Sequence, residues 1–506
     1  MNTIFVQMAA YRDPQLVPTL LDMVKNAAHP ENLHVGICWQ HGDDEPTDIF
    51  LDNGFTITGF TEVNPLIKDA LTEVTKKVTT TVTTIDPETK EEVTSEIVED
   101  VTTLEVGAPT FTMVHDSGAK YTVIDLHYYK TKGACWARNA IQQLYTDEKY
   151  TMQLDSHHRF VENWDTVSID MLEGLRADGY AKPLLTAYIP SFDPENDPDA
   201  RVMDPWKMDF DRFIPEGAVF FMPSTIDGWQ ELEKPVKARF FSAHFAFADG
   251  IFAVEVQHDP EYFFHGEEIS IGVRAFTHGY DLFHPHRLIA WHEYTRKGRI
   301  KVWDDMDTTN RLKGRFELDW VQRNDLCHKR NRILFGMDGE DPNQIDFKEY
   351  GFGTVRTVQE FEQYAGMSFK YRGVTQEVVD RLEPPGNIPY ESDEQWKAQI
   401  VRSNDVRVLV HLQNDLAFDD GIEPVVPDDM DFWYVGAARE DLSEIEGSRK
   451  DVQEHEIRTH LASGGEWADF RLIWRGNEKP KYYIVWPHSK SRGWRSERLV
   501  KEIHEH

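Results

Sequence analysis

The chain has 506 residues, of which 40% are hydrophobic and 12% aromatic, so it is long enough for two or three domains with sizeable buried cores. Its formal net charge of −34 disfavours nucleic acids and anionic membranes as partners, because both carry the same sign of charge. No apolar run reaches membrane-spanning length, and the first residues have a strand pattern rather than that of a signal peptide, so we expect a cytoplasmic protein.

The first segments alternate between strand and helix patterns. Residues 3–9 form an apolar run that predicts a buried strand. Residues 14–28 carry apolar side chains at helical spacing and follow Asp13, a suitable helix N-cap. A second strand is predicted at 34–39, and the order strand, helix, strand is typical of the start of a parallel α/β sheet.

Residues 70–108 interrupt this alternation. Two β-rich runs, 77–84 and 92–98, flank a turn signal at 86–90, which together predict a hairpin inserted between elements of the sheet. A two-stranded hairpin is marginally stable alone. We therefore keep two interpretations open, a solvated protrusion or a contact with an oligomer partner or an acceptor.

The α/β pattern resumes after residue 120. Strands are predicted at 121–126, 150–154 and 182–189, and helices at 134–145, 164–177 and 352–364. Residues 216–257 are rich in aromatic and small residues, as sheet edges and a ligand-binding cleft would need.

The C-terminal part has a different character. A Pro- and Gly-rich stretch at 383–389 predicts a linker, and the strand patterns that follow are separated by polar turns. We expect a catalytic domain over 1–380 that includes the 70–108 insertion, a linker over 381–397 and a β-rich accessory domain over 398–506. The aromatic residues of this domain are expected either in its core or stacked on a ligand, and they are Trp433, Tyr434, Trp474, Trp486 and Trp494.

Common catalytic signatures are missing from this sequence. It has no Walker loop, no Gly-x-Gly-x-x-Gly segment, no Cys-x-x-Cys pair and no Ser-centred hydrolase elbow. The three cysteines, Cys38, Cys135 and Cys327, are odd in number and far apart, which predicts reduced core residues.

The strand predicted at 150–154 ends in Asp155-Ser156-His157. In an extended segment the side chains at i and i+2 point the same way, so Asp155 and His157 are placed to share one divalent cation. Open α/β sheets bind ligands at this end of their strands. Carboxylate and imidazole ligands suit Mn²⁺, with Mg²⁺ as the alternative, and such a cation can hold the diphosphate of a sugar nucleotide. The structural alternative is a hydrogen-bonded Asp–His pair.

Further charged groups accompany this motif. Arg138 lies in the helix predicted at 134–145, where its guanidinium can pair with a phosphate or form a surface salt bridge. Gly266 precedes Glu267 and Glu268, and a glycine there allows the backbone to approach a sugar closely. Only one of two adjacent carboxylates faces a cleft in an extended segment, and we favour Glu268, with an exposed acidic turn as the alternative.

A series of motifs in fixed order carries a resemblance to a known family. They lie at 10–14, 32–40, 133–138, 153–157, 160–165, 265–268, 277–285 and 291–294. From about residue 3 to about residue 370, the chain resembles the soluble UDP-GlcNAc:hydroxyproline N-acetylglucosaminyltransferases that act on a cytoplasmic ubiquitin-ligase subunit, and their bacterial and viral relatives. This resemblance implies an α/β GT-A (Rossmann-like) mixed sheet flanked by helices, with the inserted β-hairpin. It does not cover the small β-rich C-terminal domain.

The resemblance also implies roles for the charged motifs. The Asp-x-His form is similar to that of polypeptide N-acetylgalactosaminyltransferases, where a downstream histidine completes the metal ligands. His292 takes that place here, with His286 as the competitor. The acidic residue of the Gly-Glu motif binds sugar hydroxyls or the acceptor in these families, which implies catalytic roles for Glu268 or Glu267, while Arg138 stabilises the departing UDP.

The nucleotide-sugar is expected at the carboxyl ends of the first strands. The residues assigned to it are Tyr11, Arg12 and Asp13 after the first strand, Gln40 and Asp43 after the second, and Arg138, Asp155, Trp164 and Asp165 near the metal motif. Arg274, His284 and Arg287 are expected to add positive charge against the diphosphate.

Taken together, the resemblance implies a metal-dependent retaining transferase that moves a sugar, with GlcNAc as the first choice, from a UDP-sugar to a hydroxyl on a protein. The alternatives are an acceptor that is a glycan or a hydroxymethylated base of viral DNA, a non-catalytic nucleotide-sugar-binding protein, and a metal-dependent hydrolase. Homo-oligomerisation through the hairpin or the accessory domain also stays open.

Overall fold

The computed structural model describes residues 2–85, 92–384, 386–418 and 426–503. Contacts group the chain into two compact units, the first made of residues 1–208, 223–330 and 346–358, and the second of 209–222, 331–345 and 359–506. Two short segments far upstream of the predicted accessory domain therefore cluster with the C-terminal residues. The turn predicted at 86–90 and Pro385 of the predicted linker lie outside the described residues.

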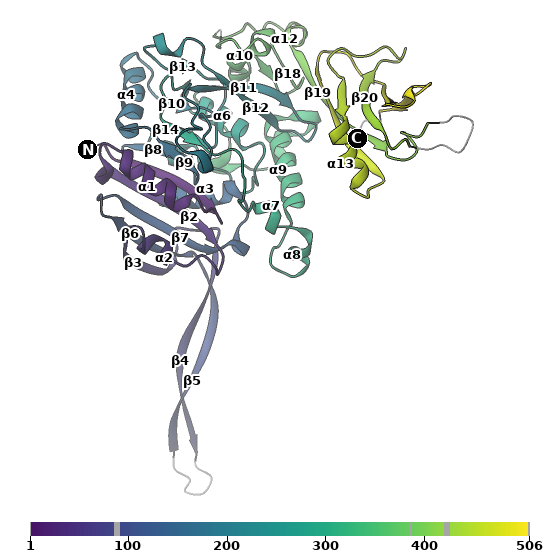
Figure 1. The fold of residues 1–506 in the computed structure, drawn as a ribbon. Helices are drawn as coiled ribbons and strands as arrows, with labels where there is room; N and C mark the ends of the chain where they lie inside the picture. Colours follow the sequence, from purple (N-terminus) through teal and green to yellow (C-terminus); the bar gives the residue numbers. More distant parts are fainter. Residues whose placement is uncertain (1, 86–91, 385, 419–425, 504–506) are drawn as a thin grey trace. The chain divides into compact units, whose positions relative to one another are not determined.

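A ten-stranded mixed sheet forms the first unit, in the order β13-β15-β10-β14-β8-β1-β2-β7-β6-β3 (Figure 1). Strands β8, β1, β2 and β7 run parallel to one another at its centre. The strands are β1 Ile4–Tyr11, β2 Leu33–His41, β3 Phe55–Asn64, β6 Ala108–His115, β7 Lys120–His127, β8 Tyr150–Asp155, β10 Pro183–Thr186, β13 Val236–Lys237, β14 Phe245–Asp249 and β15 Asp281–His284.

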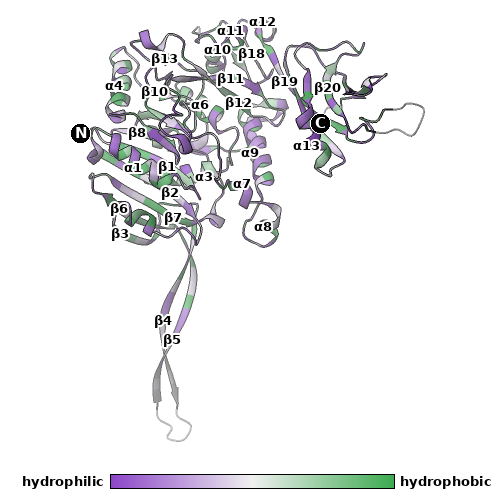
Figure 2. Cartoon of the chain, in the orientation of Figure 1, coloured by the Kyte–Doolittle hydropathy of each residue, from purple (hydrophilic) through white to green (hydrophobic). Residues whose placement is uncertain are grey.

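Helices cover both faces of this sheet because successive side chains of each buried strand point to opposite faces. In β1, Val6 and Met8 join the core that includes Leu20 of α1 and Leu172 of α4, whereas Phe5 joins the core that includes α3. Figure 2 shows apolar residues along these central strands. The helices are α1 Leu16–Asn26, α2 Asp48–Leu51, α3 Ala134–Gln142, α4 Trp164–Ala177, α5 Phe252–Glu255, α6 Glu267–Thr277, α7 Val302–Asp305 and α8 Thr308–Leu312.

The predicted hairpin is present as β4 Leu71–Ile85 and β5 Glu92–Val106. The two strands pair in antiparallel register from Leu71↔Val106 to Ile85↔Glu92 and form a two-stranded sheet of their own. Apolar side chains such as Leu104, which is 64% exposed, lie on its surface. The described part of the hairpin therefore exposes apolar surface. This is compatible with both predicted interpretations, a solvated protrusion and a contact with a partner.

The second unit is β-rich, with one helix packed into its core. The sheets are β17-β18-β19-β22 and β21-β20-β23-β24, with β25 paired to β23. The buried Trp433, Phe470 and Ile457 belong to one hydrophobic core. The elements are β17 Met367–Ser368, β18 Gly373–Val374, β19 Val401–His411, β20 Met430–Ala438, β21 Lys450–Gln453, β22 Trp467–Arg475, β23 Tyr482–Ser489, β24 Gly493–Trp494, β25 Leu499–Glu502, α11 Gln376–Val379, α12 Asp393–Gln399 and α13 Glu454–Ala462.

Several elements have residues in both units, namely β11 Trp206–Phe213, β12 Val219–Thr225, α9 Trp320–Phe335 and α10 Val358–Ala365. The three cysteines are buried and free of disulfides, as predicted. Among the residues that the structure describes, no helix combines the length and the apolar character needed to cross a membrane.

Candidate active site

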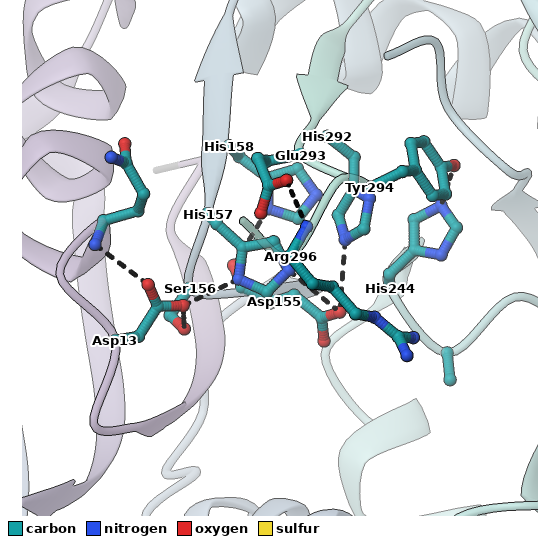
Figure 3. Close-up of polar contacts among 12 residues, drawn as sticks. Asp13, Asp155, Ser156, His157, His158, His244, His292, Glu293, Tyr294 and Arg296 are labelled. Atoms are coloured by element: carbon teal, nitrogen blue, oxygen red, sulfur yellow. Dashed lines mark hydrogen bonds and ion pairs between the residues drawn. The ribbon is translucent and has the colours of Figure 1, made fainter. Parts of the chain in front are cut away.

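Three potential metal ligands converge at the carboxyl end of β8. Donor atoms of Asp155, His157 and His292 all lie within 4.8 Å of one another. The Nε2 atom of His292 is 3.3 Å from Asp155 Oδ2, and that of His157 is 3.7 Å from the same oxygen (Figure 3). The cluster forms because β9 His158–Phe160, directly after the motif, pairs with β16 Ala290–His292 in the register that sets His292 opposite His158.

Of the two downstream histidines, the structure brings His292 to the Asp-x-His pair. His286 instead lines a different pocket, beside Asp170 and Lys234. The His292 ring also lies against the rings of His157 and His244, at centroid distances of 4.7 and 4.5 Å. The cluster therefore contains the ligand set predicted from the sequence, with the register of β9 and β16 as the reason for it.

The protonation states in this cluster fit a divalent cation. Burial lowers the pKa of His292 well below its usual range, which leaves a neutral imidazole. Burial alone would raise the pKa of Asp155, but the hydrogen bond from His292 and the charge of Arg138 hold it well below its usual range. A carboxylate together with imidazole nitrogens forms a donor set that suits Mn²⁺.

Arg138 connects this cluster to a second, fully buried one. Its Nη2 donates to Asp155 Oδ1 and its Nη1 to Glu267 Oε1, both at 2.7 Å. The other oxygen of Glu267, Oε2, accepts from the thiol of Cys135 and lies 3.5 Å from His258 Nδ1. Burial disfavours the Glu267 carboxylate, but Arg138 lowers its pKa to about 2. Glu267 thus neutralises Arg138, and Arg138 holds Asp155.

The two adjacent glutamates begin helix α6 rather than lying in the extended segment that we predicted. Gly266 precedes them at φ +90°, a conformation that favours glycine, and a helix start explains the change because carboxylates are favourable in a first turn. Glu268 is half-buried and points to other partners, accepting from Ala243 N at 3.0 Å and from the Tyr188 hydroxyl at 2.8 Å. Burial raises its pKa to about 7.

Glutamine at Glu268 is expected to change how stability depends on pH. The folded-state pKa of about 7 exceeds the ordinary 4.5, so the folded protein binds the extra proton and loses stability as pH rises from about 4.5 to 7. Glu268→Gln lacks this loss, so its free energy of unfolding relative to the parent should rise by about 2 kcal/mol across that window. Chemical denaturation at a series of pH values measures it, and parallel curves for the two proteins would contradict it.

Some of the residues predicted to bind the nucleotide line a pocket beside Asp155, His157 and His292. Tyr11, Asp13, Gln40 and Arg138 line it together with Asp155 and His157. Gln40 also accepts a hydrogen bond from Thr131. Tyr11 donates to Asp305 Oδ2 at 3.0 Å, and Arg12 pairs with the same carboxylate at 3.1 Å, so Asp305 ties α7 to the end of β1.

Other predicted residues lie away from this pocket. Trp164 is fully buried in the core, with its indole N–H donating to Met23 O, because the α4 face that bears it packs on the sheet. Asp165 accepts from the backbone N–H groups of Ala28 and His29. Arg274 is buried and donates to the backbone oxygens of Gln257, Glu349 and Gly351. His284 contacts Thr186 O, and Arg287 lines the same pocket as His286. Asp43 is exposed.

The sequence interpretation missed a basic segment. Arg296, Arg299 and Lys301 all line the pocket, between β16 and α7. Arg299 ion-pairs with Asp13 and with Glu293, at 3.3 and 3.4 Å. The signal was present in the sequence, because residues 296–301 contain four basic side chains in a chain of net charge −34. Three cationic side chains therefore line the pocket beside Asp155, His157 and His292.

A family model described as "Glycosyltransferase (GlcNAc)" matches residues 3–371. Because the match spans most of the chain, the protein belongs to this glycosyltransferase family. The prediction of a GlcNAc-family glycosyltransferase is confirmed. The predicted mixed sheet flanked by helices is present as well.

The solved structures similar to this chain include those of GalNAc-T7 and TarS. A crystal structure of GalNAc-T7 with UDP, GalNAc and Mn²⁺ shares 11% identity, with a TM-score of 0.41, over 100% of this chain and 72% of that one. Staphylococcus aureus TarS 1-349 in complex with UDP-GlcNAc shares 8% identity, with a TM-score of 0.29, over 66% and 73% of the two chains. No curated protein sequence matches the chain significantly.

Proposed function

We propose that this protein is a divalent-metal-dependent, retaining glycosyltransferase that moves a sugar, with GlcNAc as the first choice, from a UDP-sugar to a hydroxyl group. The observation that carries the proposal is the cluster of Asp155, His157 and His292 beside a pocket lined by Arg299 and Lys301. Family membership gives the reaction class, and this arrangement supports a donor that bears a diphosphate.

Asp155, His157 and His292 would hold the cation, for which Mn²⁺ is the first candidate. When bound there, such a cation neutralises negative charge on the departing diphosphate. Arg296, Arg299 and Lys301 line the same pocket and would add positive charge there, an electrostatic contribution that is usually large in group transfer.

In this proposal Arg138 does not contact the departing UDP, which is the role that the resemblance implied for it. Both terminal nitrogens of its guanidinium are held by Glu267 and Asp155, so it orients Asp155 rather than binding phosphate directly. Retention is consistent with attack from the face of the leaving group. The acceptor oxygen then bonds to the anomeric carbon as the bond to the diphosphate oxygen breaks, and the hydroxyl proton passes to that oxygen without a protein base.

We propose a protein hydroxyl as the acceptor, on the strength of the sequence resemblance to hydroxyproline-modifying enzymes. The net charge of −34 disfavours a hydroxymethylated base in DNA, because the acidic surface repels a phosphate backbone. A glycan acceptor is an outcome of the test below.

The test is UDP release from a panel of UDP-sugars, with and without Mn²⁺, combined with product analysis. We expect Mn²⁺-dependent release from one donor, with the sugar recovered on an acceptor protein or peptide. Free sugar in the presence of acceptors would indicate a hydrolase, and no consumption of any donor would indicate a binding protein. Either result would overturn the proposal.

A further inference from the structure

Asp13 has contacts that differ from those of a nucleotide ligand. It follows β1, where the sequence suggested a role in binding ribose or phosphate, but it is only 8% exposed. Its Oδ2 atom lies 2.7 Å from His157 Nδ1 and accepts from Ser156 Oγ at 2.6 Å. Its Oδ1 atom accepts from the backbone N–H of Gln15 at 2.9 Å. Both oxygens are therefore occupied by the protein itself (Figure 3).

The contact with His157 determines which ring nitrogen is free. A carboxylate only accepts hydrogen bonds, so in a neutral His157 it is Nδ1 that carries the hydrogen and donates it in a hydrogen bond to Asp13. The lone pair then lies on Nε2, the nitrogen that faces Asp155 at 3.7 Å. Metal-binding histidines commonly have this arrangement, with the second ring nitrogen donating to a carboxylate.

Arg299 complicates the contact, because its Nη1 also lies against His157 Nδ1 and is 3.3 Å from Asp13 Oδ2. If Nδ1 accepted from Arg299, its lone pair would face the Asp13 oxygen across 2.7 Å, and two acceptors repel at that distance. Asp13 and His157 follow two directly paired strands, β1 and β8, whereas Arg299 lies in an irregular segment. Arg299 also has Glu293 as a second carboxylate partner, so it keeps an ion pair when Nδ1 donates to Asp13.

We propose that Asp13 is a positioning residue, which holds His157 in the tautomer and orientation needed to bind the divalent cation. The inference rests on the proposed metal-dependent function and deepens it. It replaces the nucleotide-binding role that the position of Asp13 in the sequence suggested.

The substitution Asp13→Asn tests this role. An asparagine presents either an oxygen or an NH₂ group to Nδ1, so it no longer selects the tautomer. We expect the dissociation constant for Mn²⁺ alone, measured from the electron paramagnetic resonance of free Mn²⁺, to rise about 10- to 100-fold. At saturating Mn²⁺ the KM for the UDP-sugar should return close to the parental value, because both Asp13 oxygens are held by the protein and not by the donor.

Asp165→Asn is the matched control. Asp165 is also a buried carboxylate, but it accepts from backbone N–H groups after the far end of α1 and does not touch the cluster. Its Mn²⁺ affinity should stay at the parental value. In ¹⁵N-histidine-labelled parent protein, the His157 signals, assigned by their loss in His157→Gln, should report Nδ1–H, and Asp13→Asn should weaken that preference.

The outcomes separate this inference from the function on which it rests. Parental Mn²⁺ affinity in Asp13→Asn, an Nε2–H tautomer in the parent, or a raised KM for the donor at saturating metal would each overturn the positioning role. Failure of the parent protein itself to bind Mn²⁺ would overturn the proposed function, and this inference with it.

Discussion

Alanine at His292 is expected to lower Mn²⁺-dependent glycosyl transfer by about 10³-fold or more at a fixed metal concentration. His292 supplies one of three donor groups in the cluster, and its imidazole is kept neutral by burial. Without it, Asp155 and His157 form a two-ligand site that holds a cation weakly, and a metal-stabilised leaving group accounts for several kcal/mol of the barrier. Steady-state UDP release at a series of Mn²⁺ concentrations measures the loss.

His286→Ala is the control for that measurement. His286 is a buried histidine only six positions upstream, but it lines a different pocket and belongs to no described metal cluster. Its replacement should leave the Mn²⁺ dependence as in the parent. Equal losses in the two variants would mean that activity fell through general destabilisation, and full activity in His292→Ala would exclude it as a ligand.

The part of the site that could be predicted from sequence lies within single elements. Asp155 and His157 could be predicted to lie close together because a buried strand ends at Asp155, only two residues before His157. The helix α4 was predicted with the bounds Trp164–Ala177 that the structure shows. In these cases local periodicity determines both the element and the position of its side chains.

The rest of the site depends on contacts between distant segments. His292 reaches Asp155 only through the pairing of β16 with β9, a register that periodicity does not specify. Trp164 follows the metal motif closely in sequence, yet the apolar face of α4 turns it into the core. The direction in which Glu267 points depended on recognising that a helix begins after Gly266, where we predicted an extended segment.

Alanine at Glu267 is expected to destabilise the first unit by about 3–5 kcal/mol, which is the usual cost of leaving one partner of a buried ion pair uncompensated. Arg138 and Glu267 have side chains that are 5% and 6% exposed, and the pair is 2.7 Å apart. The variant leaves the guanidinium with Asp155 as its remaining carboxylate and removes the acceptor of the Cys135 thiol. Chemical denaturation, followed through the transition of this unit, measures the effect.

Glu195→Ala provides the comparison, because Glu195 forms an equally short pair with Lys297, 2.6 Å apart, but both side chains are more than 60% exposed. Water and salt screen such a pair, so its loss should change stability much less than the loss of Glu267 does. A similar small change in Glu267→Ala would mean that Arg138 finds another partner or water when Glu267 is absent. In that case the Arg138–Glu267 pair would not be what positions Asp155. The affinity of Glu267→Ala for Mn²⁺ would then stay at the parental value.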